Sequence, residues 1–181
     1  GLQPNVITYT AALNACLRGG EWQQAVRIIE EMKLHAVEPD VIALNAVVSA
    51  CEKGTAWQMA LTIVGGMVLR SFEPDVITYN AAISACEKAH QWERALALLG
   101  EMRQRGVKAN VITCNAAISA CSGGVKWEQA LSLREGMRQC GFNPDATTLS
   151  ATASACGHSL EWERALRLLH LGQEAVLDAV A

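Results

Sequence analysis

The sequence repeats itself every 35 residues, and no other feature constrains the fold as strongly. Similar strings begin at Val6, Val41, Val76, Val111 and Ala146. All five Trp share a second phase, at Trp22, Trp57, Trp92, Trp127 and Trp162. No insertion interrupts the period. We therefore expect the end of a truncated upstream repeat (1–5) and five repeats: 6–40, 41–75, 76–110, 111–145 and 146–180.

Each repeat is predicted to form two helices. In the third repeat these are expected over 76–88 and 91–104. Pro before most new repeats stops the preceding helix, and the Asp or Asn that follows can cap the next one. Each helix has an apolar stripe that it cannot bury alone, so neighbouring repeats must stack. The predicted fold class is all-α: an α-solenoid, a right-handed superhelix of tandem helix-turn-helix repeats.

A second face of the first helix is neither core nor ordinary charged surface. It carries positions 2, 5, 9 and 13 of the repeat, which in the third repeat are Ile77, Asn80, Ser84 and Lys88. Asn and Ser are mediocre helix formers and cost roughly 0.5 kcal/mol each against Ala. Their repetition along an array indicates a ligand that is itself periodic.

Composition and motifs argue against several other classes of protein. The net charge of −3 argues against a strongly basic nucleic-acid binder. No uncharged stretch, including the apolar one at 54–69, is as long as the roughly 20 apolar residues of a spanning helix. No Gly-rich phosphate loop, zinc-protease motif or nucleophile elbow occurs, so we expect neither enzyme activity nor a cofactor. Five of the seven Cys form a column without a C-x-x-C pair, and we expect small buried thiols rather than disulfides or a metal site.

The repeats resemble pentatricopeptide repeats of the P type, which are 35-residue RNA-binding helical hairpins. The resemblance rests on Val-Ile-Thr-Tyr-Asn-x-x-Ile at the start of a repeat, Ala-Leu in its second helix, Glu-Met before Gly, and Pro-Asp at its end. It covers residues 1–180. The chain departs from the family in having Trp where Leu is usual. Its fifth repeat also loses the pattern after Leu169, with Gly172 in the Met position and Val180 in the Asp or Asn position.

The resemblance implies an array that binds single-stranded RNA and reads one base per repeat. In the family, the fifth residue hydrogen-bonds the base edge, the last residue tunes that choice, and the β-branched residue at position 2 sandwiches the base. The implied reading pairs are Thr10 with Asp40 for G, Asn45 with Asp75 for U, Asn80 with Asn110 for C over U, and Asn115 with Asp145 for U. The implied sandwiching residues are Ile7, Ile42, Ile77 and Ile112, and Ser150 would read without its partner. The implied core is 5′-G-U-(C/U)-U-3′, with Asn5 serving the truncated upstream repeat.

Other interpretations of the same residues stay open. Asp and Asn at the repeat boundary can be helix N-caps, a role that is compatible with base tuning. Arg18, Lys53 and Lys88 fall where an RNA phosphate could pass, or they complement the dipole at the end of the first helix. The Trp column could stack on bases, although its place on the apolar stripe of the second helix favours packing between repeats.

The predicted function is sequence-specific RNA binding in organellar RNA processing, stability, editing or translation, with mitochondrion or chloroplast implied by the resemblance. We expect single-stranded RNA and other RNA-processing proteins as partners, and neither a membrane nor a small-molecule substrate. The alternatives are a protein-binding scaffold of the tetratricopeptide type, whose period is about 34 residues, and the RNA-targeting segment of a larger RNA-processing enzyme.

The start of the chain and its charge refine this prediction. The sequence begins inside a repeat, without Met and without a targeting peptide, so we expect a segment of a longer protein. The three cations of the proposed RNA face are offset by Asp40, Asp75 and Asp145, which makes this face roughly neutral. Binding should therefore depend on base contacts more than on phosphate attraction, with a shallow salt dependence.

Overall fold

The computed structural model describes residues 5–158, and these form nine helices and no strand. The helices are α1 (Val6–Gly19), α2 (Trp22–Leu34), α3 (Val41–Lys53), α4 (Trp57–Leu69), α5 (Val76–Lys88), α6 (Trp92–Gln104), α7 (Val111–Gly123), α8 (Trp127–Gln139) and α9 (Ala146–His158). The prediction for α5 is matched at both ends, and α6 begins one residue later than expected because Gln91 is its N-cap. The predicted all-α class is confirmed for the described residues. None of their helices is long and apolar enough to cross a membrane.

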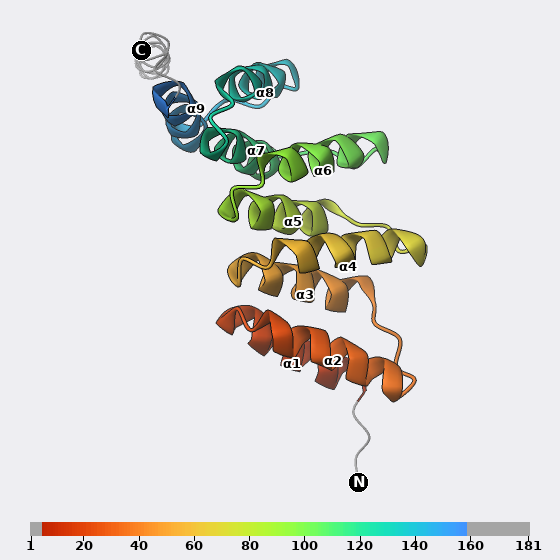
Figure 1. Ribbon diagram of the computed structural model, residues 1–181. Coiled ribbons are helices and arrows are strands. Elements are labelled where there is room, and N and C mark those ends of the chain that lie inside the picture. The colour runs from red at the N-terminus through yellow and green to blue at the C-terminus, as the bar shows by residue number, and fades with distance from the viewer. Residues whose placement is uncertain (1–4, 159–181) are drawn as a thin grey trace, which may run out of the picture. The chain divides into compact units, whose positions relative to one another are not determined.

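The chain divides into an N-terminal half, up to Ala89, and a C-terminal half, from His90, which we describe separately. In the N-terminal half α3 lies between α1 and α5, and the second helices α2 and α4 each pack against the first helices before and after them (Figure 1). In the C-terminal half α7 contacts α6, α8 and α9, and α8 also packs against α9. Within each half, the described second helices make no close backbone contact with one another. The first helices therefore hold successive repeats together.

The core of each half consists of small and medium-sized apolar side chains. Ala46, Ala50, Ala82 and Ala85 are buried on first helices of the N-terminal half, and such small side chains allow neighbouring helices to approach closely. Four members of the Cys column are buried as predicted, and Cys16 is partly buried; no disulfide joins any of the seven cysteines, all of which lie within residues 5–158. Burial raises the pKa of Cys51 and of Cys121 to about 11, so both behave as small apolar residues.

One charged side chain occupies the core column of the second helices. Arg134 of α8 stands where α2, α4 and α6 have Ile29, Val64 and Leu99, and only 9% of it is exposed. Its Nε atom has no hydrogen-bond partner among the described residues. Burial lowers the pKa of this guanidinium. The apolar stripe predicted for the second helices is thus interrupted in α8.

First and second helices begin differently. Asn5, Asp40, Asp75 and Asn110 are the N-caps of α1, α3, α5 and α7, and each side chain accepts a hydrogen bond from the backbone N–H three residues later. The second helices α2, α4, α6 and α8 have no side-chain cap. The capping interpretation of the boundary Asp and Asn therefore fits the described structure, and the second helices depend on packing of their apolar faces.

Candidate nucleic-acid interface

A column of isoleucines is exposed on the first helices. Ile7, Ile42, Ile77 and Ile112 are 77%, 66%, 56% and 65% exposed. Each is the second residue of its helix, and the opposite side of that helix packs into the core. A single exposed Ile needs no explanation, but the same exposure at the same phase of four repeats does. These side chains offer the apolar faces that the resemblance assigns to base sandwiching.

A hollow between α1 and α3 joins the predicted residues of the first base site. Its lining is Val6, Ile7, Thr10, Ala11, Asn14, Asp40 and Ile42. The predicted sandwiching residues Ile7 and Ile42 thus lie at the same hollow as the predicted reading pair Thr10 and Asp40. The Thr10 hydroxyl donates to the carbonyl of Val6 over 2.8 Å, and the Asp40 carboxylate caps α3.

The second predicted pair is in direct contact. The Asn45 amide Nδ2 donates to Asp75 Oδ1 and Oδ2, at 3.2 and 3.1 Å. A carboxylate only accepts, so this contact fixes which end of the amide faces Asp75. The amide oxygen Oδ1 then accepts a hydrogen bond from the hydroxyl of Thr78. Asp75 is held in turn by the backbone N–H of Thr78, which donates to its Oδ1 over 2.9 Å.

The fourth predicted pair has the same geometry in the C-terminal half. Asn115 Nδ2 lies 3.2 Å from both carboxylate oxygens of Asp145, and Thr148 Oγ1 donates to Asn115 Oδ1 over 2.6 Å. The Thr148 backbone N–H donates to Asp145 Oδ1 over 2.8 Å. This backbone hydrogen bond lowers the pKa of the Asp145 carboxyl, and the Thr148 hydroxyl, whose Oγ1 also lies 2.9 Å from Asp145 Oδ1, lowers it further. Asp145 is therefore a carboxylate at neutral pH.

Sequence reasoning missed the threonines of these two clusters. Thr78 and Thr148 are 0% exposed although they are polar, and each follows its Asn by 33 residues. A usable signal was present, because position 3 of the repeat is Thr8, Thr78, Thr113 and Thr148, with Ala43 as the exception.

The remaining predicted readers are Asn80, Asn110 and Ser150. Asn80 lies on α5 in the N-terminal half, and Asn110 caps α7 in the C-terminal half, so their pairing stays a prediction. Ser150 is exposed on α9. Position 180, where the family would place the partner of Ser150, and the departures at Gly172 and beyond lie outside the described residues.

The three predicted phosphate contacts are the basic residues in the last turns of α1, α3 and α5. Arg18 and Lys53 are exposed. Lys88 Nζ lies 2.9 Å from Glu52 Oε1, and that same oxygen accepts from Ser84 over 3.0 Å. All three residues are also placed to complement the helix dipole, so both interpretations stay open. Lys88 has a carboxylate beside it, which reduces its attraction for a phosphate.

The Trp column packs between repeats. Gly54 lies so close to Trp22 that a Cβ atom there would be 2.4 Å from Cδ1 of the indole. In the C-terminal half, a Cβ on Gly124 would be 2.2 Å from Cδ1 of Trp92, whose ring also has Lys126 Nζ 4.8 Å from its centre. Each indole thus contacts the end of the next first helix. This geometry favours the packing interpretation over base stacking.

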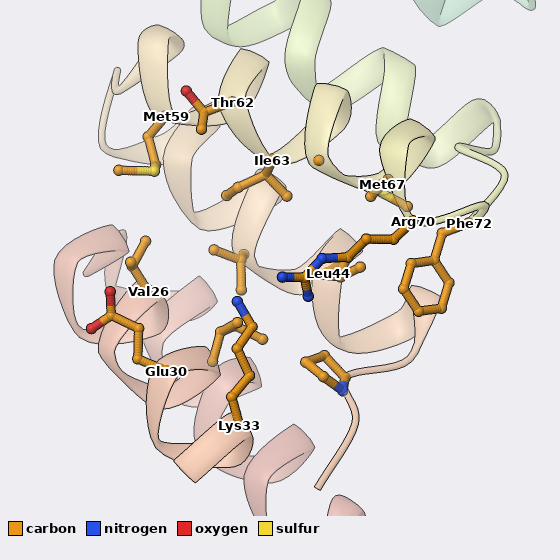
Figure 2. A pocket seen from close by; sticks show the side chains of 14 residues that line it. Val26, Glu30, Lys33, Leu44, Met59, Thr62, Ile63, Met67, Arg70 and Phe72 are labelled. Carbon is orange, nitrogen blue, oxygen red and sulfur yellow. The ribbon is translucent and has the colours of Figure 1, made fainter. Parts of the chain in front are cut away.

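A different hollow opens between α2 and α4 (Figure 2). Its lining is mostly apolar, with Leu44, Ile63 and Phe72 around it, and it has charged side chains at Glu30, Lys33 and Arg70. None of the residues predicted to contact RNA lines it, because it is formed largely by second helices. We therefore keep it separate from the candidate interface.

Comparison with known proteins supports the resemblance. Family models match residues 1–53 (pentatricopeptide repeat domain), 74–123 (PPR repeat family) and 112–142 (PPR repeat), which together cover more than half of the chain. A search of curated proteins gives no match.

Solved structures share the fold. The PPR domain of Arabidopsis thaliana protein-only RNase P 1, solved in complex with tRNA, aligns with a TM-score of 0.77 at 14% identity over 92% of this chain and 88% of that chain. Maize PPR10 in complex with an 18-nt psaJ RNA element aligns at 0.76 and 21% identity, over 99% of this chain and 26% of that chain. Nuclear proteinaceous RNase P 2 of A. thaliana aligns at 0.79 and 14% identity, over 92% and 38%. The chain thus spans about a quarter of PPR10.

The three repeat models, the 35-residue period and the helical-hairpin fold agree over the described residues. The chain belongs to the pentatricopeptide repeat family.

Proposed function

We propose that this chain binds single-stranded RNA and reads one base per repeat, with the core 5′-G-U-(C/U)-U-3′. The observation that carries the proposal is the fixed amide of Asn45 and of Asn115 on helices that also expose an Ile. Two similar structures were solved with RNA, PPR10 with an 18-nt element and the RNase P 1 domain with tRNA, which supports RNA as the class of ligand.

The chemistry of a held amide suits a pyrimidine edge. Asn45 uses one N–H toward Asp75 and one lone pair toward Thr78, which leaves a second N–H and a second lone pair. Uracil presents a carbonyl acceptor next to an N–H donor, so these two remaining groups can pair with it. At the first site the smaller hydroxyl of Thr10 leaves more space, as a purine needs. The exposed Ile side chains provide apolar contact for the base faces.

The proposal places the chain as a binding module, not as the catalyst. Its role in the cell is to hold a defined RNA segment, which protects that segment or presents it to other processing proteins. We propose an organellar RNA target on the strength of the family. The similarity to a nuclear RNase P leaves a nuclear protein, or the targeting segment of a larger RNA-processing enzyme, as the alternative.

The test is the binding of labelled short RNAs to the full chain, followed by fluorescence anisotropy. RNAs that contain the G-U-C-U core should bind more tightly than RNAs of the same composition in scrambled order. Asn45→Thr should move the preference at the second base from U toward G and leave the fourth base unchanged. Equal binding of core and scrambled RNAs refutes the base assignments, and an unchanged second-base preference refutes position 5 as the reader.

A further inference from the structure

We propose that Thr78 and Thr148 are positioning residues that, together with the boundary carboxylates of Asp75 and Asp145, hold the preceding Asn reader in the orientation that selects U over C. The proposal rests on the RNA-binding function proposed above and extends the reading site from two residues to three. The third member comes from the first helix of the next repeat. Each reader would thus be completed only by its C-terminal neighbour.

The buried location of these hydroxyls supports the proposal. Thr78 and Thr148 are completely buried, and each donates to the amide oxygen of an Asn 33 residues earlier. The Thr78 hydroxyl also accepts from the backbone N–H of Asp75 over 3.2 Å. Its single proton has two oxygens within reach, Asn45 Oδ1 and Asp75 Oδ1, and the Asn45 oxygen is the nearer of the two. The neighbouring carboxylate holds the other end of the amide. Both ends of the Asn side chain are therefore fixed.

Amide orientation matters because U and C differ by an exchange of donor and acceptor. Uracil presents O4 as an acceptor beside N3–H as a donor, whereas cytosine presents an amino donor beside N3 as an acceptor. An Asn side chain matches either base, depending on which way its amide is turned. The carboxylate of Asp75 favours one orientation by accepting from Nδ2. The Thr78 hydroxyl favours the same orientation by donating to Oδ1.

The sequence contains a natural contrast. Asn45, Asn80 and Asn115 are each followed 33 residues later by Thr, at Thr78, Thr113 and Thr148. The reader that is not Asn is Thr10, and the residue 33 positions after it is Ala43. The Thr10 hydroxyl donates to its own helix, at the carbonyl of Val6. The third-position Thr thus accompanies the side chain whose orientation needs to be set.

The experiment removes the hydroxyl and measures selectivity instead of affinity alone. Dissociation constants are measured for RNAs with U or C at the second or the fourth base. Thr78→Val keeps the shape of the side chain and should lower the U-over-C ratio at the second base by about threefold to tenfold, the effect of one hydrogen bond. The ratio at the fourth base should not change. Thr78→Ser keeps the hydroxyl and should retain the wild-type ratio.

Thr8→Val is the matched control for loss of the helix cap. Thr8 makes the same local contacts, with its N–H and its Oγ1 each 3.0 Å from Asn5 Oδ1, but it is not a hydrogen-bond partner of Asn45 or Asn115. It should leave both ratios unchanged. The converse experiment builds the site where it is absent. The single variant Thr10→Asn supplies an Asn reader at the first base, and the double variant Thr10→Asn/Ala43→Thr adds the third-position Thr. The double variant should have a higher U-over-C ratio at the first base than the single variant.

Two results would overturn the proposal. One is a Thr78→Val protein that binds all RNAs more weakly with an unchanged second-base ratio, because Thr78 would then only cap α5. The other is an unchanged NMR signal of the Asn45 side-chain NH₂ in free Thr78→Val protein, since loss of the restraint should shift and average its two proton resonances. The NMR result does not depend on RNA, so a wild-type chain that binds no RNA refutes the proposed function without deciding this inference.

Discussion

Replacement of Gly124 by Ala tests the contact that sets the spacing between repeats. The new Cβ would lie 2.2 Å from Cδ1 and 2.5 Å from Cγ of Trp92. Carbon atoms in contact are roughly 3.5 Å apart, so the indole has to retreat by about 1.3 Å. Overpacking of this kind costs roughly 1–3 kcal/mol. The lower chain entropy of Ala in the unfolded state offsets about 0.4–1 kcal/mol of that.

At the middle of these two ranges the net loss is roughly 1.3 kcal/mol, which should lower the melting temperature by about 3–5 °C for a chain of this size. The assay is thermal unfolding followed by far-ultraviolet circular dichroism. Gly100→Ala in α6 is the matched control, because its Cβ would meet no atom within 4 Å and the change should raise stability by roughly 1 kcal/mol. If Gly124→Ala melts at or above the wild type while the control rises, the indole has room to move and our account of the repeat interface is wrong.

Four further predictions follow from single residues. Arg134→Leu should raise the free energy of unfolding in urea by about 1–3 kcal/mol, because it removes a buried Nε without a partner among the described residues; a less stable variant would show that the guanidinium is paired. Because the pKa of Asp145 is lowered in the folded state, its carboxylate form stabilises the fold. This stabilisation is fully present above the ordinary Asp pKa and is lost as the pH falls through the lower pKa of the folded state. Asp145→Asn should therefore flatten the acid limb of a curve of unfolding free energy against pH. At pH 8 a thiol reagent should label exposed Cys140 quickly and buried Cys51 only on unfolding, and equal rates would contradict the packing. Lys53→Gln should reduce the slope of log K against log salt for RNA by roughly 0.7, and an unchanged slope would exclude a phosphate contact.

The 35-residue period, together with the caps and apolar stripes inside each repeat, was sufficient to predict the helices. The first helix of the third repeat is predicted and observed over 76–88, because its boundaries depend on local signals: an Asp cap at one end and the end of an apolar stripe at the other. The exposure of Ile77 also followed from helical spacing, since positions on one face of a helix need no tertiary information.

The candidate site was only partly predictable. The resemblance paired Asn45 with Asp75 although 30 residues separate them, and the structure places their side chains in contact. The buried hydroxyl of Thr78 was missed because a Thr in the first turn of a helix reads as an ordinary cap. Similarly, nothing in the sequence indicated that Glu52 lies beside Lys88, which sits 36 residues later on another helix.

By itself, the sequence determined what is local and periodic: the helix boundaries, the caps, the buried stripe and the exposed column of each repeat. The tertiary structure decided what happens where repeats meet. It placed the Trp92 indole against Gly124 instead of on the open face, and it buried Arg134 in a core column with an Nε atom that has no hydrogen-bond partner among the described residues. The physical reason is that periodicity fixes the direction in which a side chain leaves its helix, whereas its partner depends on how closely the next repeat can pack.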